Sequence, residues 1–304
     1  MIRLVKRDEI DDRLWNECIK GSPEGQAFYY TWYLDACCQN WVALILDNYD
    51  AVFPLAFRSK FGFMYLYQPF FTRHFGVISK MGSDANLRSL FLESIPEDFK
   101  YIDFCVHSFH HEIPQVFNTR EKIFQELKLS HDYSDIQKRY TDNLNRNLKK
   151  AEKAKLRLLT EFSPELVVEM FRSNQKEKLE EFSDSDYQVL KKLMHAAITS
   201  TKTICWGIQN ENGEIQSGAF FIQTGKRILY LKGFSTPSGK KNGAMHFLFD
   251  NLIHSFAGQD LTLDFGGSSI LSVARFYKNF GSDDCLYLQL RANRLPKVVR
   301  WLKR

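Results

Sequence analysis

Residues 263–281 read LDFGGSSILSVARFYKNFG and join a strand, a turn and a helix. The apolar residues at 261–265 predict a short buried strand, and the two glycines after it allow a tight turn. A serine at 268 or 269 is placed to cap a helix over 269–280, which Gly281 closes. Because side chains at strand ends line ligand crevices in α/β sheets, this stretch is also a candidate site.

The strands before this stretch predict an antiparallel meander. Asn212 and Gly213 separate the first pair of strands, Gly225 separates the second pair, and such residues supply the positive φ angles of tight hairpins. With the two helices and two strands that follow, the expected order is βββαβαβ. The expected elements of this half are helices at 164–178, 187–199, 244–256 and 269–280 and strands at 204–209, 215–223, 227–234, 261–265 and 285–291.

The first half of the chain has a similar order of elements. Because both halves run helices, strands, helix and strand, the sequence indicates a duplicated fold. The expected elements of the first half are helices at 8–19, 30–38 and 84–94 and strands at 42–46, 51–57, 63–67, 101–106 and 124–129.

The segment at 135–157 predicts one long basic helix that joins the halves. At 100° per residue, its apolar and cationic residues separate onto opposite faces. A cationic face is typical of a solvated helix, and alternatively guides tRNA or a nucleotide-linked acceptor. The expected domains are 1–134 and 159–304, with the linking helix at 135–158. The apolar face would carry Ile136, Tyr140, Leu144, Leu148, Ala151 and Ala154, and the cationic face Lys138, Arg139, Arg146, Lys149, Lys150, Lys153 and Arg157.

Composition places the chain among folded soluble proteins. Its 304 residues are 44% hydrophobic and 25% charged, which suits two domains with separate cores. No apolar run approaches the roughly 18 residues that span a bilayer, and the start MIRLVKRDEIDD lacks the apolar stretch of a signal peptide. We therefore expect a cytoplasmic protein. A net charge of +5 suits anionic partners such as CoA, nucleotides or tRNA without requiring them.

The cysteines and histidines do not predict a metal cofactor. The six cysteines form no CxxC pair and read as reduced thiols. Cys105, His107, His110 and His111 crowd the end of one strand. Neighbours on a strand alternate between faces, however, and no carboxylate pattern completes a site.

The loop before the helix at 244–256 is a candidate anion site. It contains Lys240, Lys241, Asn242 and Gly243, followed by Ala244 at the start of the helix. Helix N-termini carry N–H groups without helical partners and bind anions, and a glycine lets a phosphate approach the backbone closely. The alternative is a solvated turn whose glycine serves only the backbone geometry.

Two residues of the 263–281 stretch are candidates for chemistry. Asp264 is suited to orient or deprotonate an acceptor amine, and equally to accept hydrogen bonds from the glycine turn. Tyr277, with an ordinary pKa of about 10, is suited to protonate a leaving thiolate. An aromatic residue at helical spacing is alternatively a core residue.

Three stretches together resemble a known family. The run at 263–281 is similar to the strand–helix segment of GNAT domains, and more specifically to the FemAB-type branch. The run YTDNLNRNLKKAEKAKLRL at 140–158 resembles that branch's linker, and PLAFRSKFGF at 54–63 with QPFFTRHFG at 68–76 resembles its first domain. The resemblance implies an α/β fold of two tandem GNAT-like domains, each a mixed, mostly antiparallel sheet flanked by helices, joined by the long basic helix.

The resemblance also implies a reaction, the transfer of an acyl or aminoacyl group to an amine. The donor it implies is acetyl-CoA or another acyl-CoA, and the acceptor is a small-molecule or peptide amine. Asp264 would position the amine and Tyr277 would protonate the leaving thiolate. The alternatives are aminoacyl-tRNA-dependent transfer to a cell-wall precursor and a catalytically silent binding protein. The donor would contact Leu231, Gly233, Phe234, Lys240, Lys241, Asn242, Gly243 and Ala244.

The C-terminus predicts a short amphipathic helix. Leu295, Val298, Val299 and Leu302 form an apolar stripe with basic residues around it. Docking onto its own domain is one interpretation, and contact with an anionic lipid surface is the other.

Overall fold

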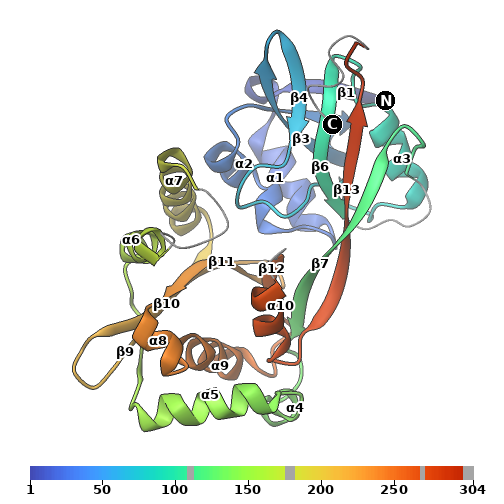
Figure 1. Ribbon diagram of the computed structural model, residues 1–304. Helices are drawn as coiled ribbons and strands as arrows, with labels where there is room; N and C mark the ends of the chain where they lie inside the picture. The colour runs from blue at the N-terminus through green and yellow to red at the C-terminus, as the bar shows by residue number, and fades with distance from the viewer. Residues whose placement is uncertain (108–112, 175–181, 268–270, 297–304) are drawn as a thin grey trace. The chain divides into compact units, whose positions relative to one another are not determined.

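The computed structural model describes residues 1–107, 113–174, 182–267 and 271–296 (Figure 1). The chain forms two compact units. The first contains Met1–Ile123 together with Leu286–Arg304, and the second contains Phe124–Cys285. The first unit is therefore built from both ends of the chain.

The first unit is a mixed sheet with helices around it. Its strands follow the order β1-β2-β3-β4-β6-β13, in which β4 and β6 are parallel and the other neighbours are antiparallel. The strand β1 precedes the helices, which corrects the prediction that this half begins with helices. Its elements are β1 (Ile2–Lys6), η1 (Arg7–Glu9), α1 (Asp12–Gly21), η2 (Ala27–Tyr29), α2 (Thr31–Cys37), β2 (Trp41–Leu46), β3 (Ala51–Lys60), β4 (Phe63–Tyr67), β5 (Ile78–Ser79), α3 (Ala85–Glu93), β6 (Phe99–His107) and most of β13 (Asp283–Asn293).

The C-terminal strand β13 completes this first sheet. It pairs antiparallel with β6 from Tyr287 opposite His107 to Asn293 opposite Tyr101. Leu290, in the middle of the strand, is fully buried. The strand expected at 285–291 is therefore present, and its pairing partner lies in the N-terminal half of the sequence.

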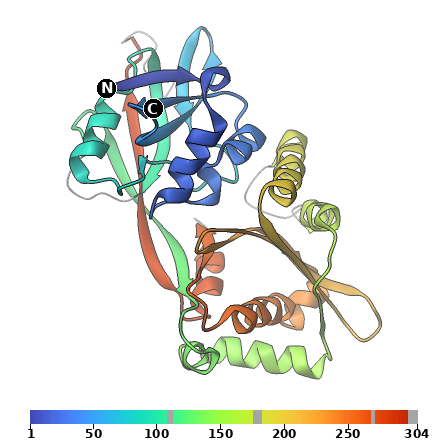
Figure 2. The same ribbon diagram turned by 180° about the vertical axis from the view of Figure 1, so that it is seen from behind.

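The second unit is also a mixed, mostly antiparallel sheet. Its strands follow the order β7-β12-β11-β10-β9-β8, with β11 and β12 parallel. Helix α9 packs on one side of this sheet and α6 on the other (Figures 1 and 2). Its elements are the end of β7 (Asn118–Lys128), α4 (Tyr133–Lys138), α5 (Asp142–Lys153), β8 (Arg157–Leu159), α6 (Pro164–Asn174), α7 (Asp184–Ser200), β9 (Lys202–Gln209), β10 (Ile215–Thr224), β11 (Arg227–Ser235), α8 (Pro237–Lys241), α9 (Ala244–Phe256), β12 (Thr262–Gly267) and α10 (Leu271–Lys278).

The predicted meander is confirmed. Strands β9, β10 and β11 pair antiparallel in sequence order. Gly213 and Gly225 occupy the two turns with φ angles of 79° and 51°. Local turn chemistry therefore determines this part of the sheet.

The expected long basic helix is divided, which corrects that prediction. Helix α4 ends at Lys138 and α5 begins at Asp142. Between them, the Thr141 hydroxyl accepts a hydrogen bond from the Leu144 N–H at 3.4 Å and caps α5. Both helices lie inside the second unit. The predicted apolar face is correct for its central residues, since Leu144 and Ala151 are buried.

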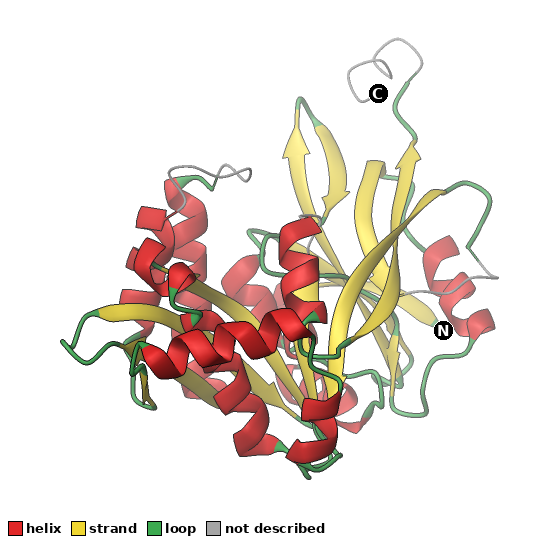
Figure 3. Ribbon diagram, turned by 60° about the horizontal axis from the view of Figure 1, so that its bottom comes forward, coloured by secondary structure: helices red, strands yellow, loops and turns green. Residues whose placement is uncertain are grey.

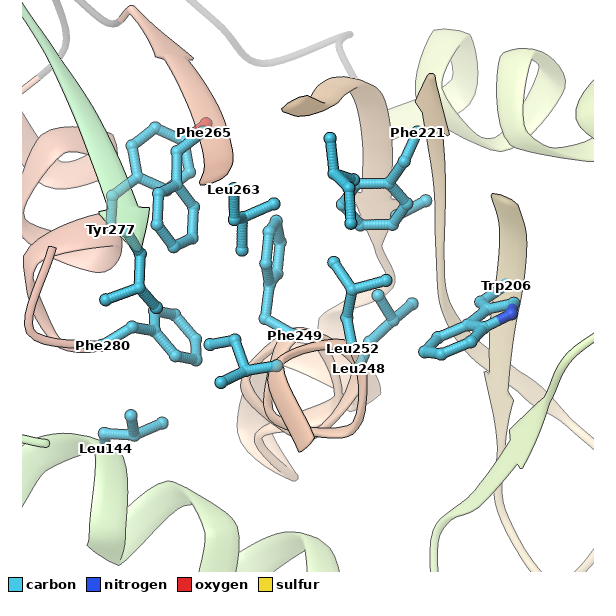
Figure 4. Close-up of a cluster of buried hydrophobic side chains, with 14 of the residues drawn as sticks. Leu144, Trp206, Phe221, Leu248, Phe249, Leu252, Leu263, Phe265, Tyr277 and Phe280 are labelled. Atoms are coloured by element: carbon cyan, nitrogen blue, oxygen red, sulfur yellow. The ribbon is translucent and has the colours of Figure 1, made fainter. Parts of the chain in front are cut away.

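An aromatic cluster forms the core of the second unit. Phe249 of α9 is fully buried, and its ring centroid lies 5.3 Å from that of Phe265 on β12 and 5.5 Å from that of Phe221 on β10. Phe280 closes the cluster from the end of α10 (Figure 4). The core thereby fixes α9, α10 and the central strands relative to one another.

Candidate active site

The parallel strands β11 and β12 pair over only three residues. The recorded pairs end with Leu229 opposite Asp264, although β11 continues to Ser235. On its other edge, β11 carries a bulge at Leu231, because Phe220 and Phe221 of β10 face Lys232 and Tyr230. A bulge bends a strand and redirects its side chains. The end of β11 therefore diverges from β12.

A cavity of about 420 Å³ lies at this point. Its walls come from the end of β11, from α6 and α8, from the first turn of α9 and from α10. Most of the lining is apolar or aromatic, as in small-molecule sites, with a few polar groups among it. The lining residues are Phe171, Asn174, Tyr230, Gly233, Phe234, Ser235, Gly239, Lys240, Met245, His246, Ser272, Val273, Phe276 and Tyr277.

Two tyrosines that line the cavity are protonated at neutral pH. Tyr277 packs against Phe265 with 5.0 Å between ring centroids, and its ring lies 6.3 Å from that of Tyr230. Burial raises the pKa of Tyr277 well above its ordinary value, and the charges of Tyr230 and Asp264 raise it further. Burial also raises the pKa of Tyr230. Both phenols are therefore proton or hydrogen-bond donors at neutral pH, and neither is a base.

Asp264 lies behind the cavity and is not among its lining residues. It is 1% exposed, and its Oδ1 accepts a hydrogen bond from the Gly266 N–H at 2.8 Å. The guanidinium of Arg227 lies 3.7 Å from its other oxygen. The hydrogen bond fixes the backbone at Gly266 near the end of β12, which matches the structural alternative for this residue.

The predicted anion loop has a regular structure of its own. The Thr236 hydroxyl accepts a hydrogen bond from the Gly239 N–H at 3.0 Å and caps the short helix α8. Lys240 lines the cavity, and Lys241 is exposed. Asn242 ends α8, and Ala244 is fully buried at the start of α9.

Gly243 serves the packing of two helices. Its φ angle is 73°, in the left-handed region, and a Cβ atom on it would lie 2.4 Å from the carbonyl oxygen of Asn147 on α5. The glycine is therefore required by the approach of α9 to α5.

At position 233, in the cavity lining, only glycine fits. A Cβ atom on it would lie 2.6 Å from the carbonyl oxygen of Gly218 and 2.8 Å from the Tyr230 hydroxyl. Together with Phe234, Lys240 and Tyr277, it is one of the predicted site residues that the cavity brings together. Leu231 is buried at the bulge and does not line the cavity.

Several polar cavity residues were missed in the sequence, among them His246 and Ser235. His246, in the first turn of α9, packs against Phe276 with 4.7 Å between ring centroids. Burial lowers the pKa of His246 to about 4, and the charge of Lys150 adds to this, so its imidazole is neutral at pH 7. Ser235 has a buried hydroxyl without a hydrogen-bond partner in the described ranges. Of these two residues, only His246 could have been predicted from the sequence, because it follows closely after the glycine that precedes helix α9.

A basic surface borders the cavity. Lys150 of α5 influences His246, and Asn147 of α5 touches the junction of α8 and α9. Lys138 and Arg139 of the predicted cationic face are instead paired with Asp135 and Asp283. The exposed bases that form this surface are Arg146, Lys149, Lys150 and Lys153 on α5 and Lys240 and Lys241 on α8.

In the first unit, the parallel strands β4 and β6 also stop pairing part-way. There, however, the residues that follow β4 fill the space beside β6. Parallel β4 and β6 pair up to Tyr67 opposite Asp103. Beyond this point, Gln68 Oε1 accepts a hydrogen bond from the Cys105 N–H at 2.8 Å. Phe75 then pairs with the β6 edge through its N–H and carbonyl groups, at 2.7 and 3.1 Å. The end of the parallel strand pair is therefore covered by the chain in the first unit and lined by a cavity in the second.

The candidate metal site, the candidate C-terminal helix and the helix cap at 268 or 269 lie partly or wholly outside the described residues. Within the described ranges, no group of three or more histidine, cysteine or acidic residues is placed to hold a metal ion, and His110 and His111 lie outside those ranges. The candidate C-terminal helix also lies outside them from residue 297 onward, as do Ser268 and Ser269. Among the described helices, none has the length and apolar character needed to span a bilayer.

Comparison with known proteins gives matches only at the level of structure. No family model and no curated protein matches the sequence. The crystal structure of FemX superposes with a TM-score of 0.68 and 12% identity, covering 97% of this chain and 99% of that one. The chain has a FemX-like tandem GNAT fold.

Two further structures support this GNAT fold. L-PGS from Bacillus licheniformis has a TM-score of 0.56 at 12% identity and covers 96% of this chain and 95% of its own. A tandem GNAT protein from the clavulanic acid biosynthesis pathway has a TM-score of 0.55 at 10% identity, with 98% and 100% covered. The FemAB-type resemblance read from the sequence is therefore confirmed for the fold.

Proposed function

We propose that the protein is an N-acyltransferase that moves an acyl group from an acyl-CoA, such as acetyl-CoA, to an amine of a small molecule or peptide. The observation that carries this proposal is the cavity where β11 diverges from β12, with protonated Tyr277 in its wall. Acyl transfer needs a pocket for the donor, N–H groups for the oxyanion and an acid for the leaving group. The end of β11 and α10 offer all three.

In the proposed reaction, the acceptor nitrogen attacks the thioester carbon and the C–S bond breaks. Backbone N–H groups of β11 beyond Leu229 stabilise the tetrahedral oxyanion. Tyr277 gives its proton to the departing thiolate, and the proton that leaves the acceptor nitrogen restores the phenol. Asp264 acts as a positioning residue, since its carboxylate holds the backbone of Gly266 near the end of β12.

The donor's phosphates are proposed to lie on the basic surface of α5 and α8. Lys240 belongs both to this surface and to the cavity lining. Lysines bind phosphate as point charges, and the first turn of α9, a helix N-terminus that favours anions, contributes Met245 and His246 to the same cavity lining. The apolar lining beyond Lys240 suits the pantetheine and acyl parts.

The test combines acetyl-CoA binding by calorimetry with thiol release over an amine library. Tyr277→Phe should lower the rate at least 100-fold while CoA still binds, because a general acid contributes about 10²–10⁴-fold. Tyr30→Phe, which removes a half-buried phenol in the first unit, is the matched control. Neither binding nor thiol release in the unmodified protein would reject the CoA proposal. Acetyl-CoA binding without thiol release in the unmodified protein, with that binding unchanged in Tyr277→Phe and Asp264→Asn, would favour a binding protein.

The basic surface specifically favours a second candidate, aminoacyl-tRNA-dependent transfer to a cell-wall precursor. Its exposed basic residues on α5 extend over residues 146–153, about two helical turns. Protein–tRNA affinity should fall steeply with salt, with a smaller slope after Lys149→Glu, Lys150→Glu and Lys153→Glu. Absence of tRNA binding at low salt would reject this candidate, while acetyl-CoA binding would be tested independently.

We also propose that the protein works in the cytoplasm. Its cysteines, all within the described ranges, form no disulfide bond. Reduced thiols are the usual state in that compartment. Fractionation of the native host should recover the protein with cytoplasmic markers, and recovery with an oxidising compartment would contradict the proposal.

A further inference from the structure

The hairpin between β3 and β4 has an unusual turn. Lys60 and Phe63 form its last cross-strand pair, which leaves Phe61 and Gly62 as a two-residue loop. Their φ angles are 52° and 79°, so both residues are left-handed. Asparagine, aspartate and glycine are the residues that favour such positions, because a bulky side chain is strained there. A phenylalanine in the first position is therefore unfavourable for the turn itself.

The ring of Phe61 also contributes little to the core. The residue is 81% exposed, and its recorded ring contact is the Lys60 ammonium at 5.3 Å. Figures 2 and 3 show the turn standing clear of the helices of the first unit. Single exposed apolar residues are common on proteins. A strained one at a hairpin tip is different, because backbone strain that benefits neither turn nor core indicates a functional contact.

The charged residues of the β3–β4 hairpin itself are all basic, and the nearest exposed acidic residues along the sheet are Glu97 and Asp98, which precede the pairing of Phe99 on β6 with Met64 on β4. Arg58 and Lys60 are exposed and two residues apart on β3, so they project from the same face of the hairpin. The whole of residues 51–83 contains no aspartate or glutamate. An apolar tip is thus combined with flanking positive charge.

We propose that the β3–β4 hairpin binds an anionic lipid bilayer, with Phe61 inserted at the headgroup boundary and Arg58 and Lys60 on lipid phosphates. An apolar residue beside basic ones is the arrangement by which proteins attach to such surfaces. A peptide or a folded partner would need a groove or complementary face around the ring. A bilayer needs only a projecting tip. One ring and two charges make this a weak, reversible attachment, which does not depend on the proposed acyl transfer.

The test is flotation of the full chain with vesicles of phosphatidylglycerol and phosphatidylcholine, against vesicles of phosphatidylcholine alone. Phe61→Asn is the decisive variant, because asparagine suits the left-handed position and preserves the fold. It should lower the bound fraction at limiting lipid at least tenfold, as should Lys60→Glu. Phe61→Trp should retain binding, since tryptophan favours the interface.

Met81→Ser is the matched control. Met81 is 94% exposed in a turn near the opposite end of β3, beside Lys80. It tests whether any exposed apolar side chain near a lysine would give the same result. Binding that persists in Phe61→Asn, is lost equally in Met81→Ser, is equally strong on neutral vesicles or is absent from anionic ones would overturn the proposal.

Discussion

The hydroxyl of Tyr230 lies 2.8 Å from the position that a Cβ atom on Gly233 would occupy. Two residues that are three apart on β11 thus share the space at the cavity wall. The bulge at Leu231 brings them together, because strict alternation would place Tyr230 and Gly233 on opposite faces. The shape of the cavity therefore depends on the absence of a side chain at position 233.

Gly233→Ala should impair the site directly. The new methyl group meets the Tyr230 hydroxyl and, at 2.6 Å, the backbone oxygen of Gly218, which cannot rotate away. Overpacking of this kind costs about 1–3 kcal/mol in the free energy of unfolding. We expect that loss in urea titrations and at least a tenfold lower rate of thiol release.

Gly21→Ala is the matched control for this change. Gly21 is the last residue of α1, and an added Cβ would find only an ordinary contact at 3.8 Å. Alanine there should leave stability unchanged or raise it by up to about 1 kcal/mol. Equal effects at the two positions would contradict the steric explanation.

His246 should make stability depend on pH. Its folded-state pKa of about 4 lies below the ordinary value of 6.5, so the folded protein binds this proton less readily than the unfolded chain. The contribution is complete above about pH 6.5 and is lost as pH falls toward 4, by at most about 3 kcal/mol. Urea titrations at several pH values should show a weaker acid dependence for His246→Asn.

Asp250, in the same helix, makes stability depend on pH in the opposite direction. Burial raises its pKa, so its contribution to stability is lost as pH rises through the folded-state pKa. The comparison should therefore use the difference between the wild type and His246→Asn at each pH, in which the Asp250 contribution cancels. An unchanged difference between pH 7 and pH 4.5 would show that His246 is not the responsible group.

Tyr140→Phe should destabilise the junction of α4 and α9. The hydroxyls of Tyr140 and Tyr133 both donate to Oδ1 of Asp250, at 2.9 and 2.8 Å. Removing one donor leaves a half-buried carboxylate less well satisfied, at a cost of about 1–3 kcal/mol. Calorimetry should show a lower Tm. Tyr133→Phe should have a smaller effect, because its position is more exposed.

The elements that the sequence predicts well are those with local causes. The meander β9–β11 follows from turn residues between alternating strands, and α9 and α10 follow from apolar periodicity and terminal glycines. The fold resemblance rests on the same local pattern around residues 263–281. By contrast, the edge strand β1 has exposed, charged residues among its apolar ones and was not predicted.

The parts that could not be predicted depend on contacts between distant residues. Gly243 looked suited to a phosphate, yet the space beside it is filled by Asn147, which no local pattern places there. His246 acquires its low pKa from burial among α10 residues and from Lys150. The bulge at Leu231 is a mismatch between two strands, and such a mismatch has no signature in either one.

Leu290→Ala should reveal which unit the C-terminal strand stabilises. Leu290 is fully buried and pairs with Phe104 of β6, although they are far apart in the sequence. The void that the smaller side chain leaves in the core should lower the free energy of unfolding by about 2–5 kcal/mol. Hydrogen exchange should then accelerate in β2, β3 and β6 of the first unit and change little in β9–β11. Leu252→Ala, at a fully buried position on α9, is the matched control and should give the reverse pattern. Faster exchange confined to the second unit in Leu290→Ala would contradict the assignment of β13 to the first sheet.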